Sequence, residues 1–160
     1  MNNSEKEKIE FNVDKGVMVA RGFMGNDKRP LAEIIENDRR VLSRYNLTCS
    51  KIASALTRLK KEGETGIGNN VIVDKIFEVN VDISRGFIRC PFDPRNHFRK
   101  TNISVRKLRT NENIFFSELS IHLIEKHCFF QGKGSPYRLE PTKLIKFLEE
   151  FFENEKKSEN

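Results

Sequence analysis

The spacing of the apolar residues changes twice along this 160-residue chain, and those changes constrain the fold more than any other feature. Between residues 31 and 59 apolar side chains recur every three or four positions, which is typical of helices with one buried face. From residue 77 to residue 83 they alternate with polar ones, as in a half-buried strand. Helical spacing returns over residues 117–127 and 141–152. Because the two periods occur in separate blocks, the sequence predicts the α+β class.

Residues with positional preferences set the expected ends of these elements. Pro30 starts the first helix, and Asp27 is its expected cap. Thr48 or Ser50 starts the second helix, and Gly63 ends it. Strands are expected as a hairpin within residues 9–20 and as a meander over residues 77–83, 87–92, 103–105 and 114–116, with a turn at residues 84–86.

The length of the chain is that of one ordinary domain, so we expect a single compact unit. We predict one α+β domain over residues 9–153, with a mostly antiparallel sheet of four to six strands and about four helices. Residues 1–8 and 154–160 are charged and have little to bury, so both are expected to be disordered tails.

Cysteine usage and hydropathy bear on the location of the protein. Cys49, Cys90 and Cys128 are odd in number and widely spaced, so they do not predict the disulfide framework of a small secreted domain. No apolar run approaches the roughly 20 residues that cross a bilayer. We therefore expect a cytoplasmic protein with no membrane partner.

Basic residues are concentrated in one segment. The formal charge is +6, yet residues 85–109 alone hold eight basic side chains against one acid, Asp93. A concentrated patch of one sign attracts polyanions, whereas scattered charge mainly aids solubility. We therefore predict a surface that binds DNA or RNA, formed by Arg85, Arg89, Arg95, Arg99, Lys100, Arg106, Lys107 and Arg109.

Three phenylalanines interleave with these basic residues: Phe87, Phe92 and Phe98. Guanidinium groups for phosphate and aromatic faces for base stacking are the combination used in binding single-stranded nucleic acid. A period of two places residues 85, 87 and 89 on one face of a strand. The alternative is three core phenylalanines beneath a solvated basic strand.

The second helix of the chain carries a set of capping, apolar, basic and terminating residues at Thr48, Ile52, Leu56, Leu59, Lys60 and Gly63. In these positions it resembles the recognition helix of winged-helix DNA-binding domains, although no family is recognised over the whole chain. That helix begins at Ser or Thr, directs Ala and Leu inward and basic residues outward, and ends before a β-wing. The resemblance implies that this helix contacts DNA, with residues 71–83 as the wing strand. The alternative is a pair of core-packed helices with solvated basic faces.

Cys90 and the three histidines, His97, His122 and His127, form a candidate set of metal ligands. The stretch "LSIHLIEKH" has the histidine spacing of the helical half of two-cysteine, two-histidine zinc fingers, which it resembles. The cysteine pair of such a finger is missing from the sequence. His122 and His127 also lie about 140° apart around a helix with about 100° per residue. We therefore expect no metal and no cofactor, with Cys90 packed as a small hydrophobe.

Nothing in the sequence supports catalysis. No serine lies in a nucleophile elbow, no cysteine and histidine share a recognisable context, and the acids do not cluster. We expect a non-enzymatic, nucleic-acid-binding or regulatory protein that acts through the basic patch at residues 85–109. An accessory module that binds an acidic protein partner is the first alternative, and a metal-dependent enzyme is the second.

Overall fold

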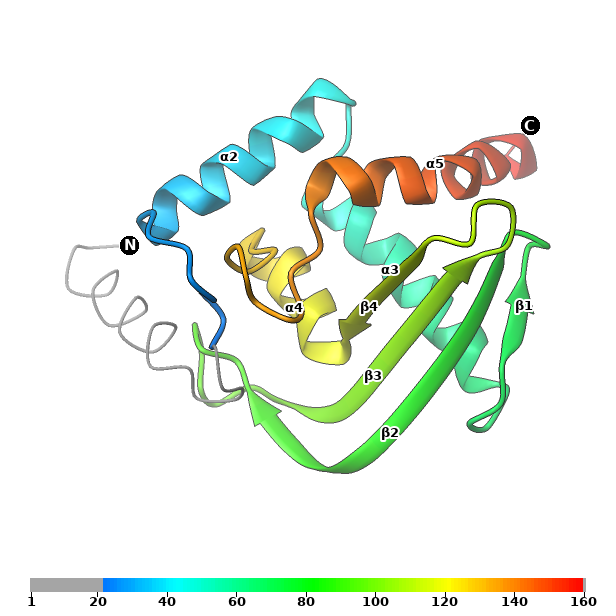
Figure 1. The fold of residues 1–160 in the computed structure, drawn as a ribbon, viewed down its shortest axis with the longest axis horizontal. Helices are drawn as coiled ribbons and strands as arrows, with labels where there is room; N and C mark the ends of the chain where they lie inside the picture. The colour runs from blue at the N-terminus through cyan, green and yellow to red at the C-terminus, as the bar shows by residue number, and fades with distance from the viewer. Residues whose placement is uncertain (1–21, 160) are drawn as a thin grey trace.

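The structure is a computed structural model that describes residues 22–159. In this part of the chain β1 (Val71–Val73), β2 (Phe77–Arg89), β3 (His97–Lys107) and β4 (Asn113–Ser117) form an antiparallel sheet in that order. The helices are α2 (Leu31–Arg44), α3 (Cys49–Glu64), α4 (Glu118–His127) and α5 (Pro141–Ser158) (Figure 1). The predicted α+β class is confirmed, with its mostly antiparallel sheet and about four helices. The expected hairpin within residues 9–20 and the tail over residues 1–8 lie outside the described residues.

The sheet buries one face and exposes the other along most of its length. Phe77, Val79 and Val81 of β2 are buried, whereas Asp82, the next residue along the strand, is exposed. Their register partners in β3 include Val105 and Ile103, which are also buried. Helices α3 and α4 contact this buried face through β2 and β3. Alternating burial of this kind is what an antiparallel sheet with one solvated face requires.

Side-chain caps start two of the helices. The Thr48 hydroxyl accepts a hydrogen bond from the Lys51 N–H at 3.1 Å, and Ser117 caps α4 in the same way. The expected cap of α2 is wrong, because the residue before that helix is Pro30 and no side chain bonds to its first turn. Asp27 is instead held by Arg29 and by the Lys133 N–H, so a partner distant in sequence takes the carboxylate.

Gly63 lies within the last turn of α3 and does not end the helix, which continues to Glu64. A Cβ atom at this position would lie 2.6 Å from a methyl carbon of Val79 and 2.8 Å from one of Val81. The glycine is therefore needed because α3 approaches β2 closely here. The sequence could not distinguish this packing role from a helix stop, since both favour glycine.

The buried side chains form two clusters. The main cluster joins α3, α5 and the inner face of the sheet. The second cluster lies where the end of β2 meets α2 and α4, and it includes Cys90. Its buried members are Phe23, Leu31, Ile34, Cys90, Leu119, Leu123 and Phe129.

The C-terminal helix is longer than expected. Residues 154–158 continue α5, although the sequence predicted a disordered tail from residue 154. Glu155 lies 3.7 Å from Lys51 and 3.9 Å from Arg58, both on α3. These contacts with another helix are not visible in the composition of the tail. No helix among residues 22–159 is long and apolar enough to span a membrane.

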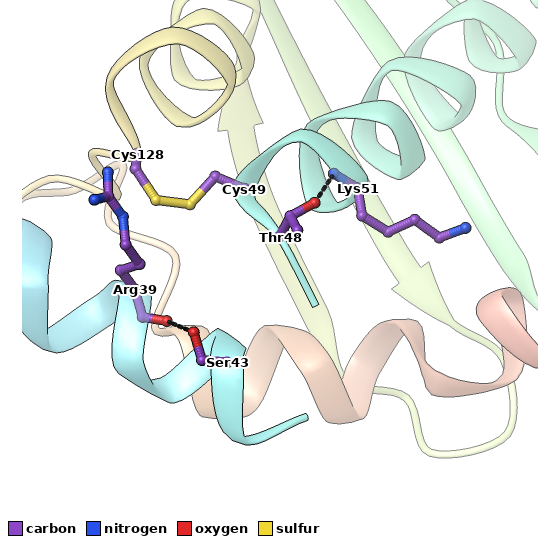
Figure 2. The surroundings of a disulfide bond; sticks show 6 residues. All are labelled: Arg39, Ser43, Thr48, Cys49, Lys51 and Cys128. Atoms are coloured by element: carbon purple, nitrogen blue, oxygen red, sulfur yellow. Dashed lines mark hydrogen bonds between the residues drawn. A yellow bond between two sulfur atoms is a disulfide. The ribbon is translucent and has the colours of Figure 1, made fainter. Parts of the chain in front are cut away.

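A disulfide links Cys49, the first residue of α3, to Cys128, the residue after α4 (Figure 2). The two Cα atoms lie 5.5 Å apart, within the usual range for a bridge. The sequence did not predict this pair, because 79 positions separate the two cysteines. The bridge holds the C-terminal end of α4, and therefore His127, next to the start of α3.

Candidate functional site in the distal ribbon

Strands β2 and β3 extend beyond the rest of the sheet as a two-stranded ribbon (Figure 1). Strand β4 pairs with β3 only as far as Asn102, and β1 pairs with β2 only as far as Val79. We call residues 84–100 the distal ribbon. Residues 77–83 and 101–107 form the proximal ribbon.

The turn expected at residues 84–86 is wrong, because β2 continues through it. The register with β3 passes from Ser84 opposite Lys100 to Phe87 opposite Arg99, which leaves two residues of β2 as a bulge. Gly86 in this bulge has a φ of 99°, a conformation that side-chain-bearing residues rarely adopt. The same glycine that indicated a turn therefore permits a bulge inside one long strand.

The burial pattern of β2 changes around this bulge. Phe77, Val79 and Val81 are buried in the proximal ribbon, whereas Ile83 just before the bulge is 55% exposed and Phe87 beyond it is 63% exposed. Ile88 is half-buried and Cys90, just beyond the strand, is fully buried in the second cluster. Bulges bend a strand and increase its twist, and two-stranded ribbons twist more than sheets. The bend visible in Figure 1 thus turns the other face of the ribbon toward the protein.

Five of the eight predicted basic residues lie on the distal ribbon and are exposed: Arg85, Arg89, Arg95, Arg99 and Lys100. Arg95 pairs with Asp93 in the loop between the strands, at 3.3 Å. The other four have no ion-pair partner among residues 22–159. The distal ribbon is therefore a concentrated positive surface.

The remaining three predicted residues do not belong to that surface. Arg106 pairs with Glu78 across the proximal ribbon, and Arg109 pairs with Glu150 of α5. Lys107 is only 4% exposed, and its ammonium group donates to the Lys146 carbonyl at 3.3 Å. Acids on neighbouring elements neutralise this end of the segment, which its own sequence could not indicate.

The sequence left open whether the three phenylalanines of the segment form a stacking surface or belong to the core, and the structure shows one exposed ring and two half-buried rings. Phe87 is exposed, and the edge of its ring meets the His97 ring at 5.2 Å between centroids. Phe92 and Phe98 are half-buried against the second cluster. The exposed face of the distal ribbon thus carries one phenylalanine, with His97 and arginines beside it.

A thiol and two imidazoles meet where the distal ribbon joins α4. The candidate ligand atoms of Cys90, His122 and His127 all lie within 4.8 Å of one another. The Cys90 Sγ and His127 Nε2 atoms are 3.7 Å apart. His97, which the sequence grouped with them, lies exposed on the ribbon and is not a member of this cluster.

The expectation that His122 and His127 point apart is wrong. Their ring centroids are 5.5 Å apart, although the residues lie five positions apart on one helix. His127 is the last residue of α4, and helical side chains lean toward the N-terminus, so its ring reaches back toward His122. The Phe92 ring stacks on the His127 ring at 4.2 Å and holds it there.

Burial sets the protonation of this cluster. It lowers the pKa of His122 and of His127 below the ordinary histidine value, and the neighbouring His122 lowers that of His127 further. Burial also raises the pKa of the Cys90 thiol, although the backbone N–H groups of Phe92 and Asp93 act in the opposite direction. Both imidazoles are therefore neutral near pH 7 and retain a lone pair for a ligand.

The helix that resembles a winged-helix recognition helix is largely engaged inside the protein. Ile52, Leu56 and Leu59 of α3 are buried, as expected from their spacing. Lys60, the basic residue expected to face DNA, pairs with Glu64 at 2.8 Å and with Glu118 at 3.3 Å. The helix packs against α4, β2 and β1. These contacts favour the reading of α3 as a core helix.

Comparisons with known proteins give no information on function, so the proposals below rest on the distal ribbon and on the Cys90, His122 and His127 cluster. No protein-family model matches the chain, and neither the curated proteins nor the solved structures contain a match.

Proposed function

We propose that the distal ribbon binds single-stranded nucleic acid, with arginines on the phosphates and Phe87 stacked on a base. The observation that carries this proposal is the exposed Phe87 ring among cations that lack acidic partners in the described part of the chain. Exposed aromatic rings and guanidinium groups together form the usual surface for single strands.

The register of the ribbon supports a row of contacts. Phe87 is paired with Arg99, and Arg89 is paired with His97, so these four side chains project from the same face. Arg85 precedes them in the bulge and is also exposed. Strand neighbours on one face lie about 5 Å apart, close enough for one strand of nucleic acid to contact several of them.

The two kinds of contact have different signatures. Each phosphate neutralised on a single strand contributes about 0.7 to the slope of log affinity against log salt concentration. Stacking of a base on an aromatic ring contributes about 1 to 3 kcal/mol and depends little on salt. Charge and stacking can therefore be separated by substituting one residue type at a time.

The test measures binding of a labelled single-stranded oligonucleotide and a duplex of equal length across a series of salt concentrations. Replacing Arg85 and Arg99 together by glutamine should reduce the salt slope by about 1.4, since two phosphate contacts are lost. Phe87→Ala should weaken binding by about 5-fold to 150-fold and leave the slope unchanged.

The matched control is Arg109→Gln, which removes an exposed arginine that pairs with Glu150 outside the distal ribbon. Binding by this variant should equal that of the unchanged protein. The proposal is wrong if no salt-sensitive binding to single strands is found, or if Arg109→Gln weakens binding as much as the distal substitutions. Competition by polyglutamate that equals competition by nucleic acid would also contradict it, because stacking would then contribute nothing.

A further inference from the structure

The Cys90, His122 and His127 cluster is the most specific arrangement of polar side chains that the basic surface does not use. Cys90 comes from the end of the distal ribbon and is fully buried. Both histidines come from α4. Aromatic rings cover the two imidazoles. The ring centroids of Phe98 and His122 are 4.4 Å apart, and those of Phe92 and His127 are 4.2 Å apart.

One atom of this cluster has no hydrogen-bond partner. His122 Nε2 is buried, and no donor or acceptor among the described residues reaches it. Leaving a buried polar atom unsatisfied costs about 1 to 3 kcal/mol, so such atoms are uncommon in folded proteins. A neutral imidazole nitrogen beside a thiol and a second imidazole would be satisfied by a metal ion.

The separation of the donors fits a metal site. With zinc bonds of about 2.3 Å to sulfur and about 2.0 Å to nitrogen, tetrahedral geometry places the two ligand atoms about 3.5 Å apart. The Cys90 Sγ and His127 Nε2 atoms are 3.7 Å apart. Thiolate and imidazole together favour zinc over the hard cations calcium and magnesium, which prefer oxygen ligands.

We propose that Cys90, His122 and His127 bind one zinc ion, whose fourth ligand is a water molecule or an external donor. Zinc forms one bond to sulfur and one to a nitrogen of each imidazole, and the Cys90 thiol proton passes to solvent. The Asp93 carboxylate is already engaged by Arg95 and Asn96, which is why it is not assigned as the fourth ligand.

The surroundings leave an approach to the fourth position. His127 and Phe92 line a cleft of about 580 Å³ between α2 and the ends of α3 and α4, so solvent reaches that side of the site. The disulfide of Figure 2 borders the same cleft and holds the residue after His127. The ion would join the end of the distal ribbon to α4, two elements that already meet in the second cluster.

A nucleophilic thiol and imidazole pair is the other chemistry that these atoms suggest. Cys90 is 0% exposed, so no substrate reaches its sulfur without opening the second cluster. Reactive cysteines are usually partly exposed in positive surroundings, whereas buried ones are inert. The geometry therefore favours a ligand for a buried ion.

The first measurement is elemental analysis of the full chain, purified without added metal or an affinity tag that binds metal. About one equivalent of zinc is expected. The protein is then stripped with a chelator, checked for folding by circular dichroism, and titrated with cobalt(II). Cobalt in the site should give a thiolate-to-cobalt charge-transfer band in the near ultraviolet and the visible absorption of a tetrahedral ion.

Variants assign the ligands. Cys90→Ser should abolish the charge-transfer band, and His122→Gln should weaken zinc binding by more than about 100-fold, since loss of an outer-shell partner alone costs 10-fold to 100-fold. His97→Asn is the matched control, because His97 is exposed and outside the cluster, and it should bind zinc as the unchanged protein does.

Three results would overturn this inference. They are a folded, stripped protein that gives no cobalt spectrum, a spectrum without the thiolate band, and equal zinc retention by Cys90→Ser and the unchanged protein. The first two results are measured on the unchanged protein, so the proposal can be refuted even if a variant is too unstable to study. These readouts contain no nucleic acid, so they succeed or fail independently of the proposed function.

Discussion

The two halves of the β2 and β3 ribbon contain similar residues, phenylalanines and arginines, but these residues differ in burial and in ion pairing. In the proximal ribbon Phe77 is completely buried, and Arg106 pairs with Glu78. In the distal ribbon Phe87 is exposed, and Arg99 beside it has no ion-pair partner among residues 22–159. Both halves belong to the same pair of strands and have the same antiparallel pairing.

The difference arises from what lies next to each half. The proximal ribbon is flanked by β1 and β4 and contacts α3 and α5, and its cations Arg106 and Lys107 are paired with Glu78 of β2 and Glu150 of α5. The distal ribbon extends past β1 and β4 and rests only its inner face on the second cluster. A basic segment in a sequence therefore forms a positive surface only where the fold leaves it without neighbouring acids.

Removal of α5 should cause the largest loss of stability, because this helix covers the proximal ribbon. Phe147 stacks on Phe77 at 5.2 Å. Burial of each large apolar side chain contributes about 1.5 to 3 kcal/mol, and a domain is stable by only about 5 to 15 kcal/mol. Deletion from Pro141 should thus abolish cooperative unfolding in circular dichroism, because six buried apolar side chains of α5 are lost: Leu144, Ile145, Phe147, Leu148, Phe151 and Phe152.

A shorter deletion is the control for that experiment. Removing residues 156–160 retains every buried side chain of α5 and the Glu155 ion pairs with α3. Its free energy of unfolding should change by less than about 1 kcal/mol. A cooperative transition in the longer deletion would show that the proximal ribbon does not depend on α5.

Substituting the two phenylalanines of β2 should give the next largest contrast. Phe77→Ala removes a fully buried ring and should lower the free energy of unfolding by about 3 to 5 kcal/mol. Phe87→Ala removes a ring that is 63% exposed and should change it by no more than about 0.5 kcal/mol. Urea unfolding of both variants measures the contrast, and equal losses would refute the division of the ribbon.

The smallest expected effect concerns acid. The hydrogen bond from Arg106 lowers the pKa of Glu78, so the ionised carboxylate stabilises the folded state at pH values above the unfolded value of about 4.3. That contribution is lost as the pH falls through the lower folded pKa. Glu78→Gln should therefore reduce the melting temperature slightly at pH 7, and the difference from the unchanged protein should shrink in acid.

Glu112→Gln, at an exposed carboxylate in the turn before β4, serves as the comparison variant. It should match the unchanged protein at both pH values. A melting temperature of Glu78→Gln that equals it at pH 7 would mean that the proximal ion pair contributes nothing measurable, as many surface pairs do.

Several features of this protein were determined by short stretches of its sequence. The helical stripe of α5 occurs as predicted, Thr48 is the cap among the two helix starts that the sequence offered, and the alternation in β2 holds as far as Val81 but fails at the exposed Ile83. Each depends on the geometry of a few consecutive residues, which is the same wherever the segment lies in a fold. The α+β class followed from the order of those local patterns.

The tertiary structure alone decided which chemical groups meet. Cys90 and His127 are separated by 37 positions, and packing of the ribbon end on α4 places their ligand atoms 3.7 Å apart. The same holds for the disulfide between Cys49 and Cys128 and for the pairing of Arg109 with Glu150. Local periodicity fixes which face of an element is apolar, but not which element covers it or where a ribbon bends. Those outcomes depend on contacts across the whole chain, and they separate the exposed cations from the neutralised ones.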